Sequence, residues 1–417
     1  MKNIRLILLM VTVPTLLPAQ NLQQKIFNFW EHVLNDSPAN DTVWAETSAG
    51  MEEYMLLFPN SKKEDELLLD LAEIYGRLNR PVKQWNSLLK LLLLHGNSAH
   101  APLARSLLDS INNYNTSKVL DIRHVAALNQ ALEKPPETDY RHAFINYLNL
   151  LVNLDIPSVN RLAVNECRLY LRLFIDDSED TALILFWKGL FEERSGQTNR
   201  AKLSFKLLQK LFPEADVVAN SYYQMALLSR DDPATARNYL VELINQFPEH
   251  PLSARAQYLF AEIYYNNGAL DEALNNFRLI LDAFPNSPLC PEALIKISAI
   301  YEEKENYEKA RRALKQAMLY NVSDKTLKKI LKQRIALEKS KSGDPETLVE
   351  TRLEYVSRFY NDPEAPGQLL AAARESLENL GDREKALQLL KRLIDNYPAG
   401  KEARQAMEME KKINNGQ

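Results

Sequence analysis

Histidines, cysteines and neighbouring carboxylates are the side chains from which this 417-residue chain would build a metal site or a catalytic centre. A metal pair on one helix face requires two ligands four residues apart, and no two of the six histidines have that spacing. They are His32, His95, His100, His124, His142 and His250. The acidic pairs Asp231-Asp232 and Glu302-Glu303 fall at expected turns and helix ends, where solvated charge is the ordinary explanation. The pattern predicts no metal site.

Motifs for phosphate binding, nucleophilic catalysis and redox chemistry are also missing from the sequence. It contains no GxGxxG, GxxxxGK[ST], HExxH, GxSxG or CxxC. Cys290 begins an expected helix beside Pro291, where a thiolate is favoured, but no histidine or second cysteine lies near it in the sequence. We therefore predict a non-enzymatic protein without a cofactor. An enzyme would require carboxylates or histidines that converge only in three dimensions.

The elements that would position any site are helical hairpins, and the stretch from Ala254 to Pro285 shows their design. Ala261 and Tyr264 share one helix face, and Ala273 and Phe277 share a face of the next helix. Gly268 supplies a permissive turn between the two helices, and Asp271 can cap or charge the start of the second. Pro285 then ends the second helix, because it disfavours a helical conformation in the preceding residue.

Similar units recur along the chain. Pro213, Pro248 and Pro285, each closing a second helix, follow one another at intervals of 35 and 37 residues. Only 11 glycines occur, which also favours helix. One hairpin cannot bury its apolar stripe alone, so the copies must stack. Because stacking brings only neighbouring units together, Cys167 and Cys290, 123 residues apart, are expected to be partly buried free thiols.

The hairpins resemble the tetratricopeptide repeat family, whose period is about 34 residues. With Ala254 as the first repeat position, six residues coincide with the family pattern: Phe260, Ala261, Tyr264, Ala273, Phe277 and Pro285. Gln257 departs from it, since a large apolar residue is usual at its position. The resemblance implies an all-α fold, a right-handed α/α superhelix of about ten helical hairpins.

We predict four segments from the fidelity of the pattern. Residues 1–19 form a signal peptide, residues 20–180 form degenerate hairpins, residues 181–322 match the repeat well, and residues 323–417 form C-terminal repeats with a capping helix. In the second segment the pattern is blurred between Ala99 and Phe174, where we expect two degenerate hairpins, with either a change of superhelical path or a boundary between two solenoid halves.

The resemblance also implies a groove lined by the first helix of each hairpin. The residues at the groove-facing repeat positions are Asn220, Tyr223, Arg230, Arg255, Tyr258, Glu262, Tyr265, Asn266 and Glu302. Tyrosine rings flanked by arginine and asparagine can hold an extended peptide by stacking and hydrogen bonding. The same composition is common on an ordinary solvated helix face, so both interpretations stay open at this stage.

The N-terminus predicts export. Lys2 and Arg5 precede the apolar run Leu6–Leu17, and Ala19 is the expected cleavage site. The mature chain then has 49 basic and 55 acidic residues, a formal net charge of −6, which argues against nucleic acid as a partner. No cysteine stands directly after the apolar run, so lipidation is not expected, and no membrane span remains after cleavage. An uncleaved anchor or a buried first helix is the alternative.

The segment from Phe247 to Leu314 is similar to repeats of bacterial cell-envelope proteins, namely the Tol-Pal-associated cell division coordinator and the lipoprotein of the outer-membrane β-barrel assembly machinery. Shared features are the proline after each second helix and Tyr264-Tyr265 ahead of an Asn-Asn-Gly turn. The chain lacks the N-terminal coiled coil of the coordinator and the lipidation cysteine of the assembly lipoprotein. The resemblance implies a periplasmic scaffold that binds protein or peptide partners, with envelope proteins as candidates, in envelope assembly or transport. The alternative is a glycan-handling protein of polysaccharide export or the cell wall.

Overall fold

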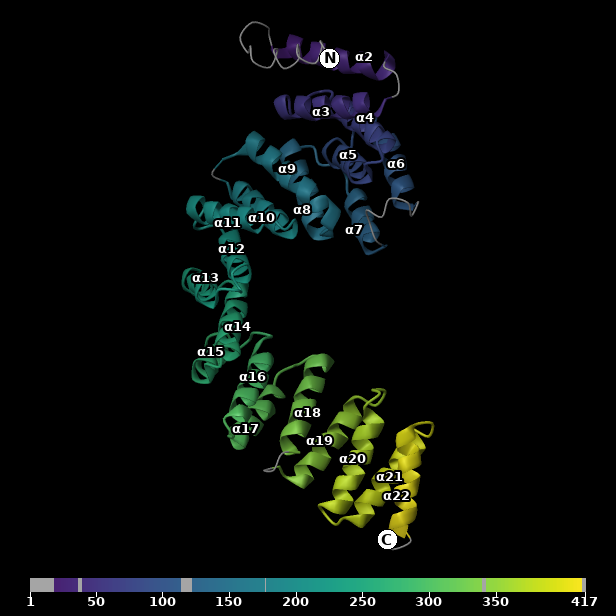
Figure 1. The fold of residues 1–417 in the computed structure, drawn as a ribbon, viewed down its shortest axis with the longest axis vertical. Coiled ribbons are helices and arrows are strands. Elements are labelled where there is room, and N and C mark those ends of the chain that lie inside the picture. The colour runs from purple at the N-terminus through teal and green to yellow at the C-terminus, as the bar shows by residue number, and fades with distance from the viewer. Residues whose placement is uncertain (1–18, 37–39, 114–121, 177, 340–342, 415–417) are drawn as a thin grey trace. The chain divides into compact units, whose positions relative to one another are not determined.

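The computed structural model describes residues 19–36, 40–113, 122–176, 178–339 and 343–414. Within these ranges every regular element is an α-helix, which confirms the all-α prediction (Figure 1). The expected signal peptide lies outside the described residues except for Ala19, the first residue of α2. No helix in the described ranges has the length and apolar character required to cross a membrane.

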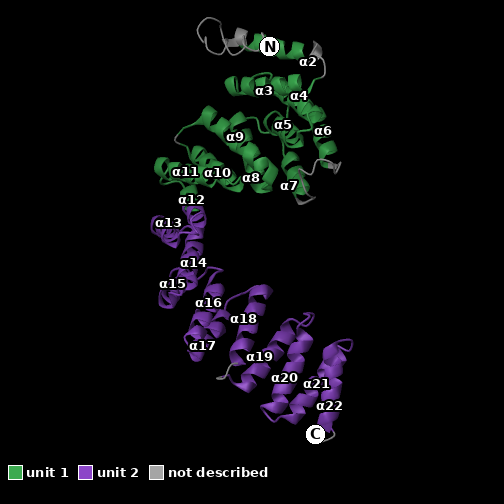
Figure 2. Ribbon diagram, viewed as in Figure 1, with its two compact units in different colours: residues 1–221 green, residues 222–417 purple. Residues whose placement is uncertain are grey.

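The chain divides into two compact units, residues 1–221 and residues 222–417 (Figure 2). Unit 1 contains α2 (Ala19–Asp36), α3 (Asp41–Leu57), α4 (Glu64–Arg77), α5 (Pro81–Leu94), α6 (Ala101–Asn113), α7 (Ile122–Leu132), α8 (Tyr140–Leu154), α9 (Pro157–Phe174), α10 (Glu179–Arg194) and α11 (Thr198–Leu211). The helix α12 (Val217–Leu227) contains the boundary between the units.

Unit 2 contains α13 (Pro233–Gln246), α14 (Pro251–Asn266), α15 (Leu270–Ala283), α16 (Cys290–Glu303), α17 (Tyr307–Ala317), α18 (Asp324–Glu338), α19 (Pro345–Arg358), α20 (Ala365–Glu378), α21 (Arg383–Asn396) and α22 (Lys401–Asn414). Consecutive helices pack against each other, so hairpins such as α14/α15, α16/α17 and α20/α21 stack in chain order. This sequential packing is the arrangement expected of a helical repeat array.

The core of each hairpin follows the sequence prediction. Ala261, Ala273, Phe277 and Ile280 are fully buried in one cluster with residues of α16 and α17. Gln257, the departure from the repeat pattern, is also buried, and its Nε2 donates hydrogen bonds to the backbone oxygen of Asn276 at 3.2 Å and to its Oδ1 at 2.9 Å. A side-chain amide thus joins α14 to α15 where other repeats use apolar contact.

The second helices end in a recurrent cap. Phe212, Phe247, Phe284 and Tyr397 each follow the last helical residue and have φ between −130° and −133°. A proline comes next in every case, and it disfavours helical geometry in the residue before it. The prolines read from the sequence therefore end these helices as predicted.

Several hairpins have one residue with positive φ in the turn between their two helices. Gly196, Gly268 and Gly381 occupy this position in three hairpins, with φ of 75°, 74° and 64°. Asn79 and Glu305 occupy it in two others, with φ of 51° and 55°. A side chain in this conformation costs about 1 kcal/mol, which glycine avoids.

We expect Glu305→Gly to raise the free energy of unfolding of unit 2 by roughly 0.5–1 kcal/mol, because the exposed Glu305 holds φ at 55°. Urea titration followed by circular dichroism measures the change. Gly268→Ala is the reciprocal variant and should be destabilising, although the added Cβ would meet no atom within 4 Å. Equal stability of all three proteins would show that the turn conformation carries no strain.

In unit 1 the stacking order is interrupted in the segment where the sequence pattern is blurred. The helix α5 packs against α8 as well as against α4 and α6, while α7 packs against α8. The helix α9 then packs against α10. The helices α5 and α8 therefore contact each other directly, although α6 and α7 lie between them in the sequence and the contacting residues are about 60 positions apart. Strict repeat periodicity does not predict this contact.

Candidate binding surfaces

The predicted groove residues fall mainly on the first helices of two neighbouring hairpins. Asn220 belongs to unit 1, and the other eight lie in unit 2. Tyr258, Glu262 and Tyr265 follow one another along α14, at spacings of four and three residues, and all three are half-buried. Arg255 and Asn266 are exposed at the two ends of the same helix.

Contacts between helices place these α14 residues beside side chains of α16. Lys296 Nζ lies 3.0 Å from Glu262 Oε1 and 5.2 Å from the centroid of the Tyr265 ring. The Tyr265 hydroxyl donates a short hydrogen bond to Glu303. This bond, together with burial, raises the pKa of Tyr265 to about 12, so the phenol stays protonated at neutral pH.

The next first helix continues the same surface. Glu292 on α16 accepts from Lys329 Nζ at 2.6 Å and from Thr326 Oγ1 at 3.3 Å, and both partners belong to α18. We call the surface made by Tyr258, Glu262, Tyr265, Glu292, Lys296, Glu303 and Lys329 the α14–α16–α18 face. Its ion pairs join adjacent hairpins and hold the rings of α14 in place.

Several predicted residues remain outside this network. Arg230 is exposed in the turn after α12, and Arg255 is exposed near the start of α14. Neither makes an ion pair within the part of the chain that the structure describes. Lys296, in contrast, was missed by sequence reasoning, because its repeat position is not one that the family resemblance assigns to the groove. The two arginines remain available to a ligand, whereas Glu262 already has a cation.

A buried polar cluster holds unit 1 together. Glu64 is 1% exposed at the start of α4, and its carboxylate accepts a hydrogen bond from the Tyr140 hydroxyl at 3.0 Å. His95 Nε2 lies 3.6 Å from the same carboxylate. Burial raises the pKa of Glu64, but His95, Lys90 and Tyr140 outweigh burial, and the net effect lowers it. Glu64 is therefore charged when folded.

Lys90 on α5 is the cation of this cluster. It is 2% exposed, and its Nζ lies 2.9 Å from Glu166 Oε2 on α9 and 5.2 Å from the centroid of the Phe144 ring. Burial lowers its pKa, whereas Glu166 and Glu64 raise it by more. Sequence reasoning missed this buried charge, although a lysine inside the run Leu88-Leu89-Lys90-Leu91 is a signal for one. The pair ties α5 directly to α9.

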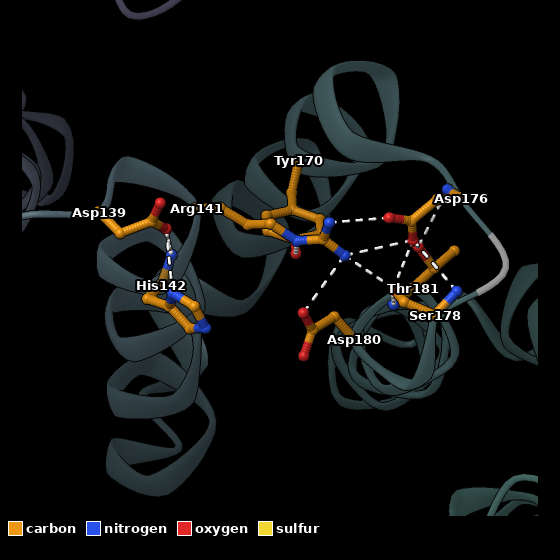
Figure 3. Close-up of polar contacts among 8 residues, drawn as sticks. All are labelled: Asp139, Arg141, His142, Tyr170, Asp176, Ser178, Asp180 and Thr181. Atoms are coloured by element: carbon orange, nitrogen blue, oxygen red, sulfur yellow. Dashed lines mark hydrogen bonds and ion pairs between the residues drawn. The ribbon is translucent and has the colours of Figure 1, made fainter.

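A second polar cluster, centred on Arg141, joins α8, α9 and α10 (Figure 3). The guanidinium donates to Asp176 Oδ2 at 2.7 Å, Ser178 Oγ at 2.7 Å and the Tyr170 hydroxyl at 3.1 Å. The Arg141 hydrogen bond is the main reason why the pKa of Asp176 is lowered. Every partner is a structural neighbour, so this cluster positions helices.

The two thiols are buried and free, as expected. The sequence placed Cys290 at a helix start, which favours a thiolate, but burial dominates and raises the pKa of that thiol. Burial likewise raises the pKa of Cys167. No group of three or more histidine, cysteine or acidic side chains in the described residues is arranged to hold a metal ion.

Asp70 on α4 gives unit 1 a pH dependence. Burial, with repulsion from Glu66 and Glu73, raises its pKa to about 6. The contribution of Asp70 to the stability of unit 1 is therefore fully present below the ordinary carboxyl pKa, and it is lost as pH rises through about 6. We expect Asp70→Asn to stabilise unit 1 by about 1–2 kcal/mol at pH 8 after allowance for partial exposure, and by much less at pH 4. Urea titrations of both proteins at the two pH values measure this difference, and an equal gain at both would contradict it.

Stacked helical hairpins with polar first-helix faces define the class of helical-repeat scaffolds. Family models of the tetratricopeptide repeat match residues 227–290, 291–321 and 369–399. The chain therefore carries tetratricopeptide repeats in these segments, which confirms that part of the predicted resemblance. The α14–α16 part of the face lies inside the first two matches. None of these models is specific for a cell-envelope family, and a comparison with curated proteins found no match.

Solved structures of helical-repeat proteins are similar to this chain at low identity. YrrB, a tetratricopeptide repeat protein with an unusual peptide-binding site, is 20% identical over 49% of this chain and 94% of its own, with a TM-score of 0.32. PilW, a type IV pilus biogenesis factor, is 15% identical over 54% and 98%, with a TM-score of 0.34. A tetratricopeptide repeat protein from Parabacteroides merdae is 13% identical over 74% and 97%, with a TM-score of 0.32. TM-scores this low leave the repeat matches as the basis for the class.

Proposed function

We propose that this protein is a non-enzymatic scaffold that binds a protein or peptide partner on the α14–α16–α18 face. The observation that carries the proposal is the coincidence of the repeat matches with Tyr258 and Tyr265, whose rings are held half-buried by neighbouring helices. Such rings offer apolar contact area that loses little entropy on binding. Arg255, unpaired and exposed on the same helix, supplies charge for a ligand carboxylate or backbone carbonyl.

The test is crosslinking and mass spectrometry with the purified protein in extracts of the cells that produce it. The variant Arg255→Ala/Tyr265→Ala removes the Tyr265 ring from the face and the exposed Arg255 guanidinium from the same helix, and it leaves Tyr258, which packs on the buried Phe277 ring. Arg392→Ala, an exposed arginine on α21, is the matched control. We expect partners that the control retains and the double variant loses. An identical partner set for both variants would refute the face as the site.

A glycan ligand is the second candidate, because tyrosine rings also stack on sugars. Calorimetry with peptidoglycan fragments and export polysaccharides distinguishes the two, since only a glycan site gives heat that the Tyr265→Ala variant loses. Such heat, together with an empty partner set, would replace the peptide proposal.

Export to the periplasm without lipidation is part of the proposal, supported by the basic start and apolar run of residues 1–19. N-terminal sequencing of protein recovered from a periplasmic fraction should begin near Gln20. Recovery of a chain that starts at Met1, or recovery only from the cytoplasm, would exclude export. A role in envelope assembly or transport follows only if the captured partners belong to that compartment.

A further inference from the structure

Unit 1 contains a surface groove that shares no residue with the α14–α16–α18 face. A cavity of about 610 Å³ lies between α5 and α9, with further walls from α3 and α4. Apolar side chains including Leu56, Leu71, Leu162 and Leu169 line it. Leu56 is 41% exposed there.

A second cavity, of about 680 Å³, adjoins the first along α9. It is lined by α9 and by the turn between α10 and α11. Arg161, Asn165 and Arg168 line both cavities, so one face of α9 separates them. We call the two together the α9 groove.

The charge of the α9 groove opposes that of the whole chain, which is −4. Its basic residues are Lys83, Lys90, Arg161, Arg168, Arg172 and Arg200, and its acidic residues are Glu52 and Glu166. Each acid is already paired with a lysine, Glu52 with Lys83 at 2.8 Å and Glu166 with Lys90 at 2.9 Å. The arginines are therefore in excess.

The arginines of α9 have little internal compensation. Arg161 and Arg172 are exposed and make no ion pair among the described residues, and Arg168 lies 3.7 Å from Glu192, which Lys188 approaches more closely at 2.9 Å. Guanidinium groups match carboxylates with two parallel hydrogen bonds. Their position beside an apolar cavity wall points to a ligand that is both anionic and apolar.

We propose that the α9 groove binds an acidic peptide segment that also carries apolar side chains. The distance along α9 from Arg161 to Arg172 is about 16 Å at 1.5 Å per residue. An extended chain covers that distance with about five residues at 3.3 Å each. Carboxylates of such a segment reach the arginines while its apolar side chains cover Leu56 and Leu162. This site is independent of the α14–α16–α18 face.

The test begins with an array of eight-residue peptides that alternate glutamate or aspartate with leucine or valine, each beside its glutamine or asparagine counterpart. The full chain is then titrated against the best acidic peptide, labelled with fluorescein, by anisotropy at two salt concentrations. We expect binding to the acidic peptides, no binding to the amide counterparts, and weaker binding at high salt because the contacts are ionic.

The variant Arg161→Gln/Arg172→Gln should weaken that binding at least tenfold, because it removes the two uncompensated guanidinium groups. The matched control Arg392→Gln/Arg404→Gln removes two exposed arginines of unit 2 and should leave the affinity unchanged. An unaltered tryptophan emission spectrum shows that each variant is folded in unit 1.

Three results would overturn the proposal. The protein could bind none of the acidic peptides, it could bind the amide peptides with the same affinity, or both double variants could lose the same amount of affinity. Sedimentation with vesicles of phosphatidylglycerol, abolished by Arg161→Gln/Arg172→Gln in a protein that retains no peptide, would replace the peptide by an anionic lipid surface. None of these outcomes bears on the Arg255→Ala/Tyr265→Ala comparison, so the two proposals fail separately.

Discussion

Lys90→Met is expected to lower the free energy of unfolding of unit 1 by about 3–5 kcal/mol, because it leaves the largely buried Glu166 carboxylate without its paired cation and removes a positive charge near Glu64. Glu64 is 1% exposed, and the Glu166 side chain is 15% exposed. Methionine fills a similar volume, so the loss of stability measures the removal of the charge and not the creation of a cavity. The cost should shrink as pH falls, because Glu64, whose pKa Lys90 helps to lower, can then be protonated.

Tryptophan fluorescence measures this change in unit 1 alone. All four tryptophans, Trp30, Trp44, Trp85 and Trp187, lie in unit 1, and Trp85 belongs to the same helix as Lys90. Urea titrations of the parent protein and the variant give the difference. Lys391→Met, an exposed lysine on α21, is the control and should change stability by less than about 0.5 kcal/mol.

The double variant Lys90→Met/Glu166→Leu tests the mechanism. Replacement of a buried ion pair by apolar residues is often close to neutral, so we expect it to recover much of the loss. Glu64 keeps His95 and Tyr140 as partners in that protein. A single variant as stable as the parent, or a double variant no better than the single one, would show that the pair does not stabilise the contact between α5 and α9.

Phe277→Ala is expected to cost about 3–5 kcal/mol in unit 2, because it removes a fully buried ring from the centre of a tetratricopeptide hairpin. Its ring packs edge-on against Tyr258 at 5.3 Å, between the buried Ala261 and Ala273. The loss includes the cavity that neighbouring side chains cannot fill by relaxation. The aromatic contact beneath the α14–α16–α18 face is lost as well.

Comparison of two spectroscopic signals checks this result. Circular dichroism follows both units, whereas tryptophan fluorescence follows only unit 1. In Phe277→Ala the dichroism transition should move to lower urea while the fluorescence transition stays in place. Leu279→Ala on the same helix is the control, since Leu279 is 49% exposed. A loss below about 1 kcal/mol in Phe277→Ala would contradict the assignment of this ring to the core.

The repeats could be predicted from sequence wherever the governing interactions are local. Pro285 and the turn at Gly268 act on the backbone within a few residues, so they mark helix ends in any context. Ala261, Ala273 and Phe277 belong to apolar stripes that recur at the helical period of 3.6 residues, and all three are buried in the core. The sequence by itself therefore determined the helices and their hairpins, whereas the assignment of Tyr258 and Tyr265 to a groove came from the family resemblance.

Only the tertiary structure decided which side chains meet across hairpins. Lys296 approaches Glu262 and Tyr265 from another helix, and Tyr140 reaches Glu64 across 76 residues. Sequence periodicity predicts neither contact, because each contact depends on how far one stacked helix is shifted along the next. Burial of Cys290 similarly reversed the thiol pKa expected from its helix start. Helix ends and stripes are local properties of the chain, whereas charge pairing and desolvation depend on packing, and packing placed the excess arginines beside the apolar wall of the α9 groove.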